Sequence, residues 1–344
     1  LDSKRISGTT ADRNGTPAVS GGWKELGRTT LGSAGTTITV SGLADKRYYK
    51  ILTSSKGSGS PDYTARINSD TGSTYASRWM DNGSGENTGV SRTSMLYDSV
   101  GGGFNHKFNI GYIANLASKE KLSINHSADS DTSAASTAPS RSETVHKWAN
   151  TSDALSAFSL ISTVNMDIGS EVVVLGWDED DTHSTNFWEE LASVNASGSS
   201  TNLSSGTITA KKYLWIQCYS EGTGGDILTT FNNDTGSNYN RRYSIDGGAD
   251  GSDVNETSMA NMHNAGLAGD DAFSNWFIIN NSANEKLVIG HSVQNGAAGA
   301  ATVPLRVEFV HKWANTSAQI TEIDFDSHSG NFGSDSIIKV WGSD

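Results

Sequence analysis

The sequence predicts an all-β protein built from two β-sandwich, jelly-roll-like domains in tandem. One observation is a duplication: the octapeptide Val145–Ser152 returns unchanged as Val310–Ser317, an offset of 311 − 146 = 165 residues between its histidines. The other is the pattern of short runs of β-branched and aromatic residues, which Gly, Ser, Asn and Asp separate. No segment shows the apolar periodicity of a helix. A period of this length is that of an ordinary domain rather than of a solenoid repeat.

The repeat divides the 344 residues into four parts. Residues 1–22 are polar and predict an extended N-terminal arm. Residues 23–178 form the first β-sandwich module, residues 179–187 an acidic linker, and residues 188–344 the second module.

Each module contains about eight or nine predicted strands, the number expected for a two-sheet sandwich. Polar stretches at 83–90, 127–140 and 249–256 predict loops at the ends of the sandwiches. The predicted strands lie at 36–40, 47–54, 75–80, 107–116, 121–126, 144–148, 158–164 and 171–177, and then at 207–210, 212–219, 227–231, 275–279, 286–291, 303–313, 320–325 and 336–341.

The composition excludes several classes of partner. A net charge of −13 with scattered Lys and Arg disfavours nucleic acid, whose phosphates such a surface repels. No apolar run approaches the roughly 20 residues of a membrane helix, so no membrane partner is expected. The single cysteine, Cys218, lies in an apolar run and predicts a buried core thiol.

The duplicated histidines are candidates for metal ligands, but their spacing favours packing. His146 and His311 sit in predicted strands beside tryptophans, and His126 and His291 fall at strand ends. A metal site needs several ligands that converge on one point, and the chain has no HxH or HExxH spacing. We expect rings packed beside Trp and hydrogen-bonded to backbone.

Asp-Thr-Gly-Ser occurs once in each module, at Asp70–Ser73 and Asp234–Ser237. The tripeptide Asp-Thr-Gly marks the nucleophile loops of aspartic proteases, where two carboxylates share a proton. The apolar strand that precedes it in those enzymes is missing here. The segments predict turns, with the Asp side chain folded onto its own backbone and Gly supplying a positive φ.

Two further sets of residues are candidate binding sites. Asp246, Asp250 and Asp253, set among glycines, could supply oxygen ligands to Ca²⁺, although the spacing is not that of an EF-hand and a solvated acidic loop is the alternative. Trp79 and Trp276 are candidates for exposed aromatic rings that stack on sugars. Apart from Ca²⁺ the sequence predicts no cofactor.

Three segments carry a resemblance to a known group of proteins. Trp23–Val40, Arg47–Leu52 and Asn232–Tyr239 resemble modules in uncharacterised structural proteins of marine tailed bacteriophages. The resemblance covers Trp23–Gly342, and the second copy departs at its start, where Ala192–Asn195 stands in place of Gly27–Thr30. It implies a virion component and supplies no catalytic residues.

We therefore expect a non-enzymatic virion structural protein on the particle surface, a capsid decoration or spike protein that associates with copies of itself and with other virion proteins. A different class of function remains open: a carbohydrate- or receptor-binding module of a tail fibre, or a secreted adhesin, that binds a host surface glycan. An enzyme would require Asp70 and Asp234, or an unrecognised pair of carboxylates, to meet.

Overall fold

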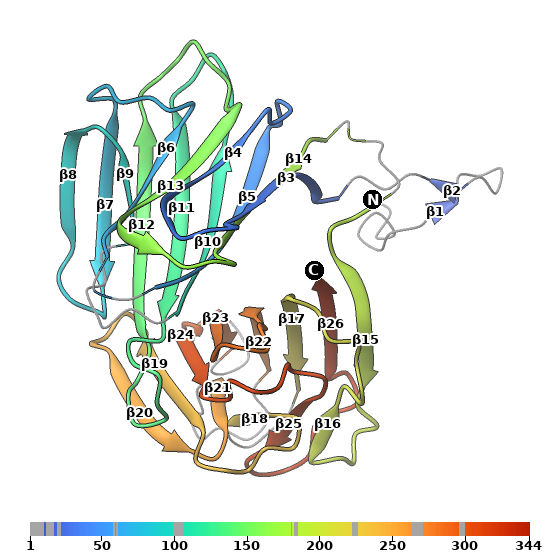
Figure 1. Ribbon diagram of the computed structural model, residues 1–344. Helices are drawn as coiled ribbons and strands as arrows, with labels where there is room; N and C mark the ends of the chain where they lie inside the picture. The colour runs from blue at the N-terminus through green and yellow to red at the C-terminus, as the bar shows by residue number, and fades with distance from the viewer. Residues whose placement is uncertain are drawn as a thin grey trace.

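The computed structural model describes residues 10–11, 17–18, 22–57, 59, 61–98, 106–179, 181, 185–221, 226–262, 271–295 and 300–344. Every regular element in these ranges is a β-strand. The prediction of an all-β protein with two tandem β-sandwiches is confirmed: each module pairs an eight-stranded sheet with a four-stranded sheet (Figure 1). Within the described ranges no helix has the length and apolarity needed to cross a membrane.

In the first module the wide sheet has the order β3-β14-β5-β10-β11-β12-β7-β8, and the narrow sheet has the order β4-β13-β6-β9. All the pairings between neighbouring strands are antiparallel. The strands are β3 (Lys24–Thr30), β4 (Gly35–Ser41), β5 (Tyr48–Lys56), β6 (Tyr63–Ile67), β7 (Tyr75–Asp81), β8 (Asn87–Arg92), β9 (Met95–Asp98), β10 (His106–Ala114), β11 (Lys121–Asp129), β12 (Ser140–Trp148), β13 (Ala157–Met166) and β14 (Glu171–Trp177).

The second module repeats this topology, with the wide sheet β15-β26-β17-β22-β23-β24-β19-β20 and the narrow sheet β16-β25-β18-β21. The strands are β15 (Glu189–Asn195), β16 (Asn202–Ser204), β17 (Tyr213–Ser220), β18 (Ile227–Phe231), β19 (Tyr239–Ile245), β20 (Gly251–Glu256), β21 (Met259–Met262), β22 (Ala272–Ile279), β23 (Lys286–Gln294), β24 (Leu305–Trp313), β25 (Ile323–Ser327) and β26 (Ile337–Ser343).

Each sandwich has its own core between its two sheets. Because successive side chains of a strand point to opposite faces, one residue in two faces the narrow sheet. Ile51 and Val174 pack there against Phe158 and Leu160 in the first module, and in the second Ile216 and Val340 pack with Phe325. The predicted core thiol Cys218 is buried in the second core.

The first four residues of the octapeptide form the ends of β12 and β24, and their inward side chains explain a second repeat. The indole of Trp148 donates a hydrogen bond of 2.7 Å to Asp70 Oδ2, and Trp313 donates one of 2.8 Å to Asp234 Oδ2. Asp70 Oδ1 also accepts the backbone N–H of Gly72 at 2.7 Å. The two Asp-Thr-Gly segments are thus turns, each tied to the tryptophan of its own module.

The prediction that glycine supplies the positive φ in these turns is wrong. The positive φ values belong to the two preceding residues, 53° and 56° at Asn68 and Ser69, and 53° and 55° at Asn232 and Asn233. Asn tolerates this region better than most residues, and Asn68 Oδ1 is held by the backbone N–H groups of Ser156 and Ala157, at 2.8 and 3.0 Å.

Two loop predictions and one strand prediction also fail. Residues 83–90 and 249–256, predicted as loops, contain most of β8 and all of β20, which are the outermost strands of the wide sheets. Residues 207–210, predicted as a strand, are irregular. Of the predicted arm, only Thr10–Ala11 (β1), Pro17–Ala18 (β2) and Gly22 are described; β1 and β2 pair antiparallel, and the rest lies outside the described residues.

Candidate functional site at the module interface

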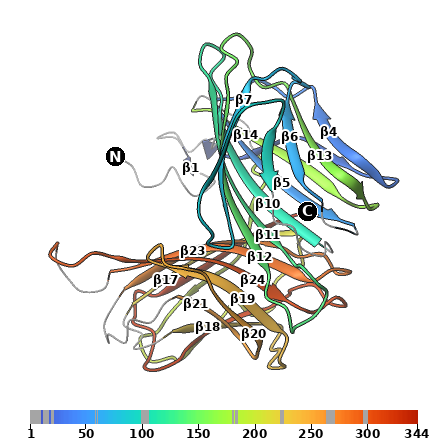
Figure 2. The same cartoon turned by 90° about the vertical axis from the view of Figure 1, so that its left-hand side faces the viewer.

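The two wide sheets face each other with their outer surfaces and bury a third apolar cluster between the modules. In Figure 2, β10, β11 and β12 of the first module descend onto the sheet that contains β23 and β24. Phe108 and Ile110 meet Leu287 and Ile289 in this cluster. The full set of buried members is Leu52, Phe108, Ile110, Ala128, Val173, Leu175, Phe187, Tyr213, Phe277, Ile279, Leu287, Ile289 and Val310.

The interface is heterologous, because the modules use different parts of the same sheet. The second module contributes a docking face of six residues, all buried: Tyr213, Phe277, Leu287, Ile289, Val310 and Lys312. Lys312 Nζ donates hydrogen bonds to the carbonyls of Ser130 and Thr132 in the first module, at 2.9 and 2.8 Å. Val310 and Lys312 are the outward residues of the second octapeptide.

The first module carries the same face, uncovered. Subtracting 165 from each position of the docking face gives Tyr48, Tyr112, Leu122, Ile124, Val145 and Lys147, which we call the open face. Five of the six residue types are identical. The apolar members are 38–58% exposed on the open face, against 0–7% for their counterparts on the docking face.

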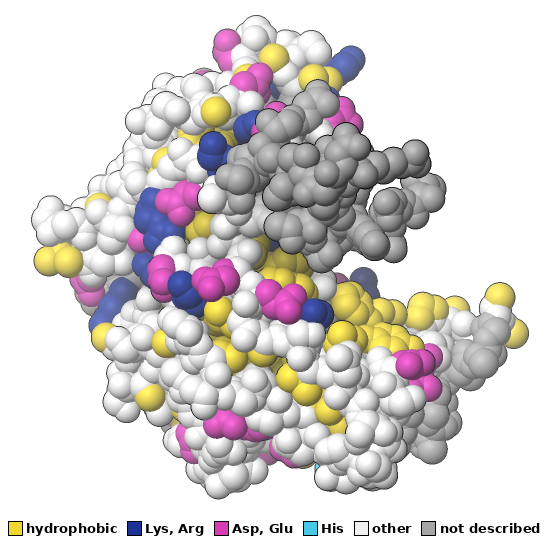
Figure 3. Space-filling view, turned by 90° about the vertical axis from the view of Figure 1, so that its right-hand side faces the viewer, with side chains coloured by type: hydrophobic (Ala, Val, Ile, Leu, Met, Phe, Trp, Pro, Cys, Tyr) yellow, Lys and Arg dark blue, Asp and Glu magenta, His cyan; other side chains and the backbone are white. Residues whose placement is uncertain are grey.

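A groove of about 380 Å³ lies on the open face, with walls that are almost entirely apolar. The aromatic rings of Trp23, Tyr48, Tyr112 and Trp177 line it together with Leu122 and Ile124. Figure 3 shows apolar side chains gathered in the hollow between the two modules.

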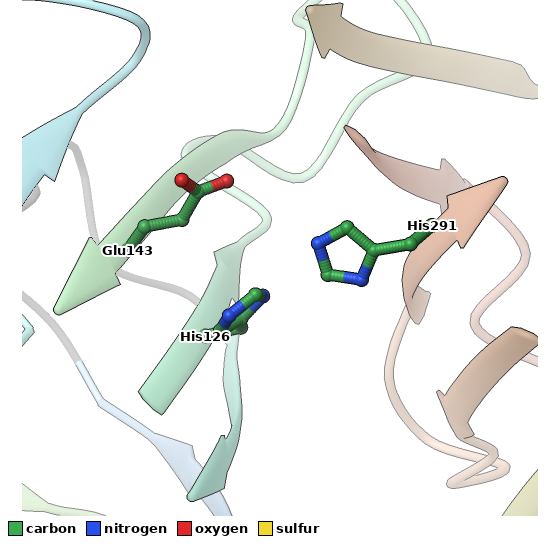
Figure 4. A group of neighbouring side chains, drawn as sticks. All are labelled: His126, Glu143 and His291. Atoms are coloured by element: carbon green, nitrogen blue, oxygen red, sulfur yellow. The ribbon is translucent and has the colours of Figure 1, made fainter. Parts of the chain in front are cut away.

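A polar cluster lies within the interface. His126 and Glu143 stand opposite each other on β11 and β12, and His291 approaches from β23 of the second module (Figure 4). One ligand atom from each of the three residues lies within 4.8 Å of the others. The two imidazole rings are 4.7 Å apart between centroids, and a small cavity of about 10 Å³, the space of one water molecule or ion, adjoins them.

Carboxylates outnumber guanidinium groups around this cluster. Arg141, almost fully buried, makes two hydrogen bonds to Asp250 of the second module, of 2.7 and 2.9 Å. The same guanidinium also contacts Glu143, and it reaches Glu308 at 3.5 Å. Three carboxylates therefore share one buried guanidinium, and Arg306 approaches Glu308 from the exposed side at 3.5 Å.

Burial sets the protonation states of the cluster. It lowers the pKa of His126 to about 3, with smaller contributions from His291 and Arg141, and it also lowers the pKa of His291. Burial raises the pKa of Glu143 to about 6, where Arg141 opposes the shift and Glu308 adds to it. Near neutral pH both imidazoles are therefore uncharged and able to offer a lone pair.

A second buried polar group in the interface is Lys50, on β5. Its ammonium group faces aromatic rings, and no carboxylate pairs with it among the described residues. Burial lowers its pKa to about 7. The rings lie 4.6 to 5.7 Å from Nζ and belong to Trp23 and Tyr112 of the first module and to Trp188, Trp215 and Phe277 of the second.

The three candidate Ca²⁺ ligands are not brought together. Asp250 is held by Arg141, Asp253 forms an ion pair of 2.6 Å with Arg241, and Asp246 accepts the backbone N–H of Arg306 at 2.8 Å. Each carboxylate thus has its own partner, and they form no common cluster in the described part of the chain.

The two candidate sugar-stacking tryptophans have different environments. Trp276 is 0% exposed and packs against Phe309 and Phe325 in the second core, so the prediction that it contacts a glycan is wrong. Its position on β22, which alternates inward, accounts for the burial. Trp79 is half-buried beside Arg92, outside the groove. The aromatic groove of the open face was not predicted.

The aspartic dyad does not form either. Asp70 and Asp234 each accept the indole N–H of their own module's tryptophan and sit in separate turns. The residues that do meet, His126 with His291 and Glu143 near Glu308, share the 165-residue offset (291 − 126 and 308 − 143). That equality was a signal in the sequence, although only the packing of the two sheets shows that the pairs converge.

No family model and no curated protein matches the chain. Among solved structures it has some likeness to domains LG4-5 of the mouse laminin alpha1 chain, with 13% identity over 92% of this chain and 88% of that one, and a TM-score of 0.20. Neisserial surface protein A has 6% identity, coverage of 82% and 99%, and a TM-score of 0.11. Ail of Yersinia pestis has 7% identity, coverage of 75% and 99%, and a TM-score of 0.13. At these scores the likenesses carry no argument about function.

Proposed function

We propose that the protein is a non-enzymatic structural component of a virion surface, a decoration or spike protein of a tailed phage, that assembles with copies of itself through the open face of its first module. The observation that carries this proposal is the agreement between the open face and the docking face. One copy of the face already binds a β-sandwich within the chain, and the other copy is exposed.

The retained residue types support a binding role for the open face. An exposed Leu, Ile or Val gains little from solvent, so an isolated surface would tolerate polar residues at Leu122, Ile124 and Val145. A contiguous apolar patch at the surface typically marks an interaction site. The second module offers a complementary surface, because Phe273 and Val293, at the positions that correspond to the buried Phe108 and Ala128, are 41% and 42% exposed.

Head-to-tail contact between the open face of one chain and the Phe273 surface of the next is a heterologous interaction, which closes into rings or extends into arrays. Such repeated contacts suit a particle coat. Gln217 and Asn275 replace the Leu52 and Ile110 of the intramolecular interface, so this contact is more polar and its affinity is expected to be lower.

Sedimentation velocity of the purified chain over a range of concentrations tests the assembly. We expect reversible association in the wild type and its loss in Ile124→Lys, where a charge replaces a side chain that is 53% exposed. Val303→Lys is the matched control, because Val303 is 78% exposed and outside the open face. Association that persists unchanged in Ile124→Lys would refute the role of the open face.

Immunogold electron microscopy of particles from the source culture tests the location. Even labelling of the capsid supports a decoration protein, whereas label on the tail favours receptor binding. Bare particles beside labelled cell surfaces would overturn the virion assignment and leave an adhesin in its place.

The aromatic groove supports a second candidate, a glycan-binding role. Trp23, Tyr48, Tyr112 and Trp177 present apolar ring faces of the kind that stack on sugars. A glycan array with the wild type and Tyr112→Ala distinguishes the two candidates. Binding that Tyr112→Ala abolishes would favour the glycan-binding module, and no binding at all would leave the assembly role.

A further inference from the structure

We propose that His126, His291 and Glu143 form a transition-metal site, of the zinc type, that clamps the two modules together. This inference does not depend on the proposed virion function. Its basis is geometric: ligand atoms of three residues from two modules lie within 4.8 Å of one another beside a cavity large enough for one ion.

The donor set matches zinc rather than calcium. Zinc prefers imidazole nitrogen with carboxylate oxygen, whereas calcium takes six to eight oxygen ligands. In a tetrahedral site with Zn–N of ~2.0–2.1 Å, neighbouring ligand atoms lie roughly 3.4 Å apart, so ligand atoms that are now up to 4.8 Å apart need to approach by up to about 1.4 Å through side-chain rotation. Glu308, opposite His291 on β24, or a water molecule can take the fourth position.

The histidines also lack other partners. Neither the ring of His126 nor that of His291 forms a hydrogen bond with any described residue, although both rings are largely enclosed. Buried polar groups are normally satisfied by protein, water or an ion. The carboxylates carry excess negative charge as well, since three of them, Glu143, Asp250 and Glu308, face two guanidinium groups, buried Arg141 and exposed Arg306. A dication would satisfy both requirements.

The duplication provides an independent argument. His126 and Glu143 of the first module recur at the same offset as His291 and Glu308 of the second, in the same cross-strand arrangement. The interface is heterologous elsewhere, and the apolar faces on its two sides are not equivalent. The two His–Glu pairs nevertheless line the same small cavity within it, and His126, Glu143 and His291 have ligand atoms within 4.8 Å of one another there.

Binding of Zn²⁺ to the full chain after dialysis against a chelator tests the site, with Co²⁺ as a spectroscopic probe of coordination. We expect one ion per chain, Co²⁺ absorption typical of tetrahedral geometry, and a rise in Tm on addition of Zn²⁺. His126→Asn and His291→Asn should each lose the binding and the rise in Tm. Glu143→Gln, the milder change, should weaken the binding.

His328→Asn is the matched control, because His328 is exposed in the second module, and it should bind like the wild type. Circular dichroism establishes that each variant is folded. Absence of binding in the wild type, or full binding retained in both His126→Asn and His291→Asn, would overturn the proposal, and the latter result would place the bound ion elsewhere.

Discussion

At the residue scale, His146 and His311 show that identical sequence does not give identical environments. His146 forms hydrogen bonds with the hydroxyls of Thr144 and Ser77, at 2.9 and 3.1 Å. His311 is 0% exposed, packs against Phe309, and neither of its ring nitrogens has a hydrogen-bond partner among the described residues. Phe309 takes the place of Thr144 in the repeat, which removes one partner.

This difference predicts opposite effects of the same substitution. His311→Leu removes an unsatisfied buried group and should leave the free energy of unfolding unchanged or raise it by about 1 kcal/mol. His146→Leu leaves two hydroxyls unpaired and should lower it by about 1–3 kcal/mol. Urea unfolding of both variants measures the difference, and equal destabilisation would contradict it.

Lys50 predicts a pH dependence of stability. Burial lowers its pKa from 10.5 to about 7, so between these values the unfolded chain binds more protons than the folded chain. The free energy of unfolding should therefore rise with pH in this window, by up to ~1.4 kcal/mol per unit, relative to Lys50→Met. Urea unfolding at pH 7 and pH 9.5 measures the rise. If the free energies of unfolding of the wild type and Lys50→Met changed in parallel with pH, the surrounding rings would stabilise the cation enough to keep the pKa of Lys50 near its usual value.

At the element scale, the Asp-Thr-Gly-Ser turns act as anchors for the octapeptide strands. Burial opposes ionisation of Asp70, but hydrogen bonds from Trp148, Gly72 and Thr74 outweigh it and lower its pKa. A depressed folded pKa gives stability that is present above the unfolded pKa and lost as pH falls through the folded one. Asp70→Ala should cost about 1–3 kcal/mol at neutral pH and less in acid. A loss that does not change between pH 7 and pH 3 would refute the ionic part of this explanation.

The sequence predicts many of the strands that bury a face, but it misses β6, β9 and β19, which are also buried. β5, β10 and β14 are inner strands of a wide sheet, and their runs of β-branched and aromatic residues identify them. β8 and β20 are polar edge strands that lie on no core, so nothing in their apolar pattern separates them from loops. The candidate site was hidden for a different reason. Its residues lie on the outer faces of the wide sheets, and from the sequence alone such residues are indistinguishable from solvent-exposed ones until the packing of the two sheets is known.

At the scale of the whole molecule, the duplication produces two modules, each with a hydrophobic core of its own, and one interface between them. The core of each module contains none of the residues of the apolar cluster between the modules. Each module is therefore expected to fold on its own core even when the two modules are not docked. The octapeptide contributes to both core packing and the interface. Its His and Trp face the core, while its Val and Lys form part of the docking face in one copy and of the open face in the other.

Leu287 and Leu122, the same residue at equivalent positions, test this separation. Leu287→Asp places a charge in the interface and should weaken the free energy of docking between the modules by more than ~3 kcal/mol, while the core of each module stays intact. Leu122→Asp changes a side chain that is 58% exposed and should alter stability by no more than ~0.5 kcal/mol.

Calorimetry and small-angle scattering report the outcome. At concentrations too low for the chains to associate, the wild type and Leu122→Asp should unfold in one transition with the same radius of gyration, because docking couples the modules. Leu287→Asp should keep its β-sheet circular dichroism, expand, and unfold in two transitions. Global unfolding of Leu287→Asp would show that the second module needs the interface in order to fold, and the open face would then be a remnant of that need and not a spare binding surface.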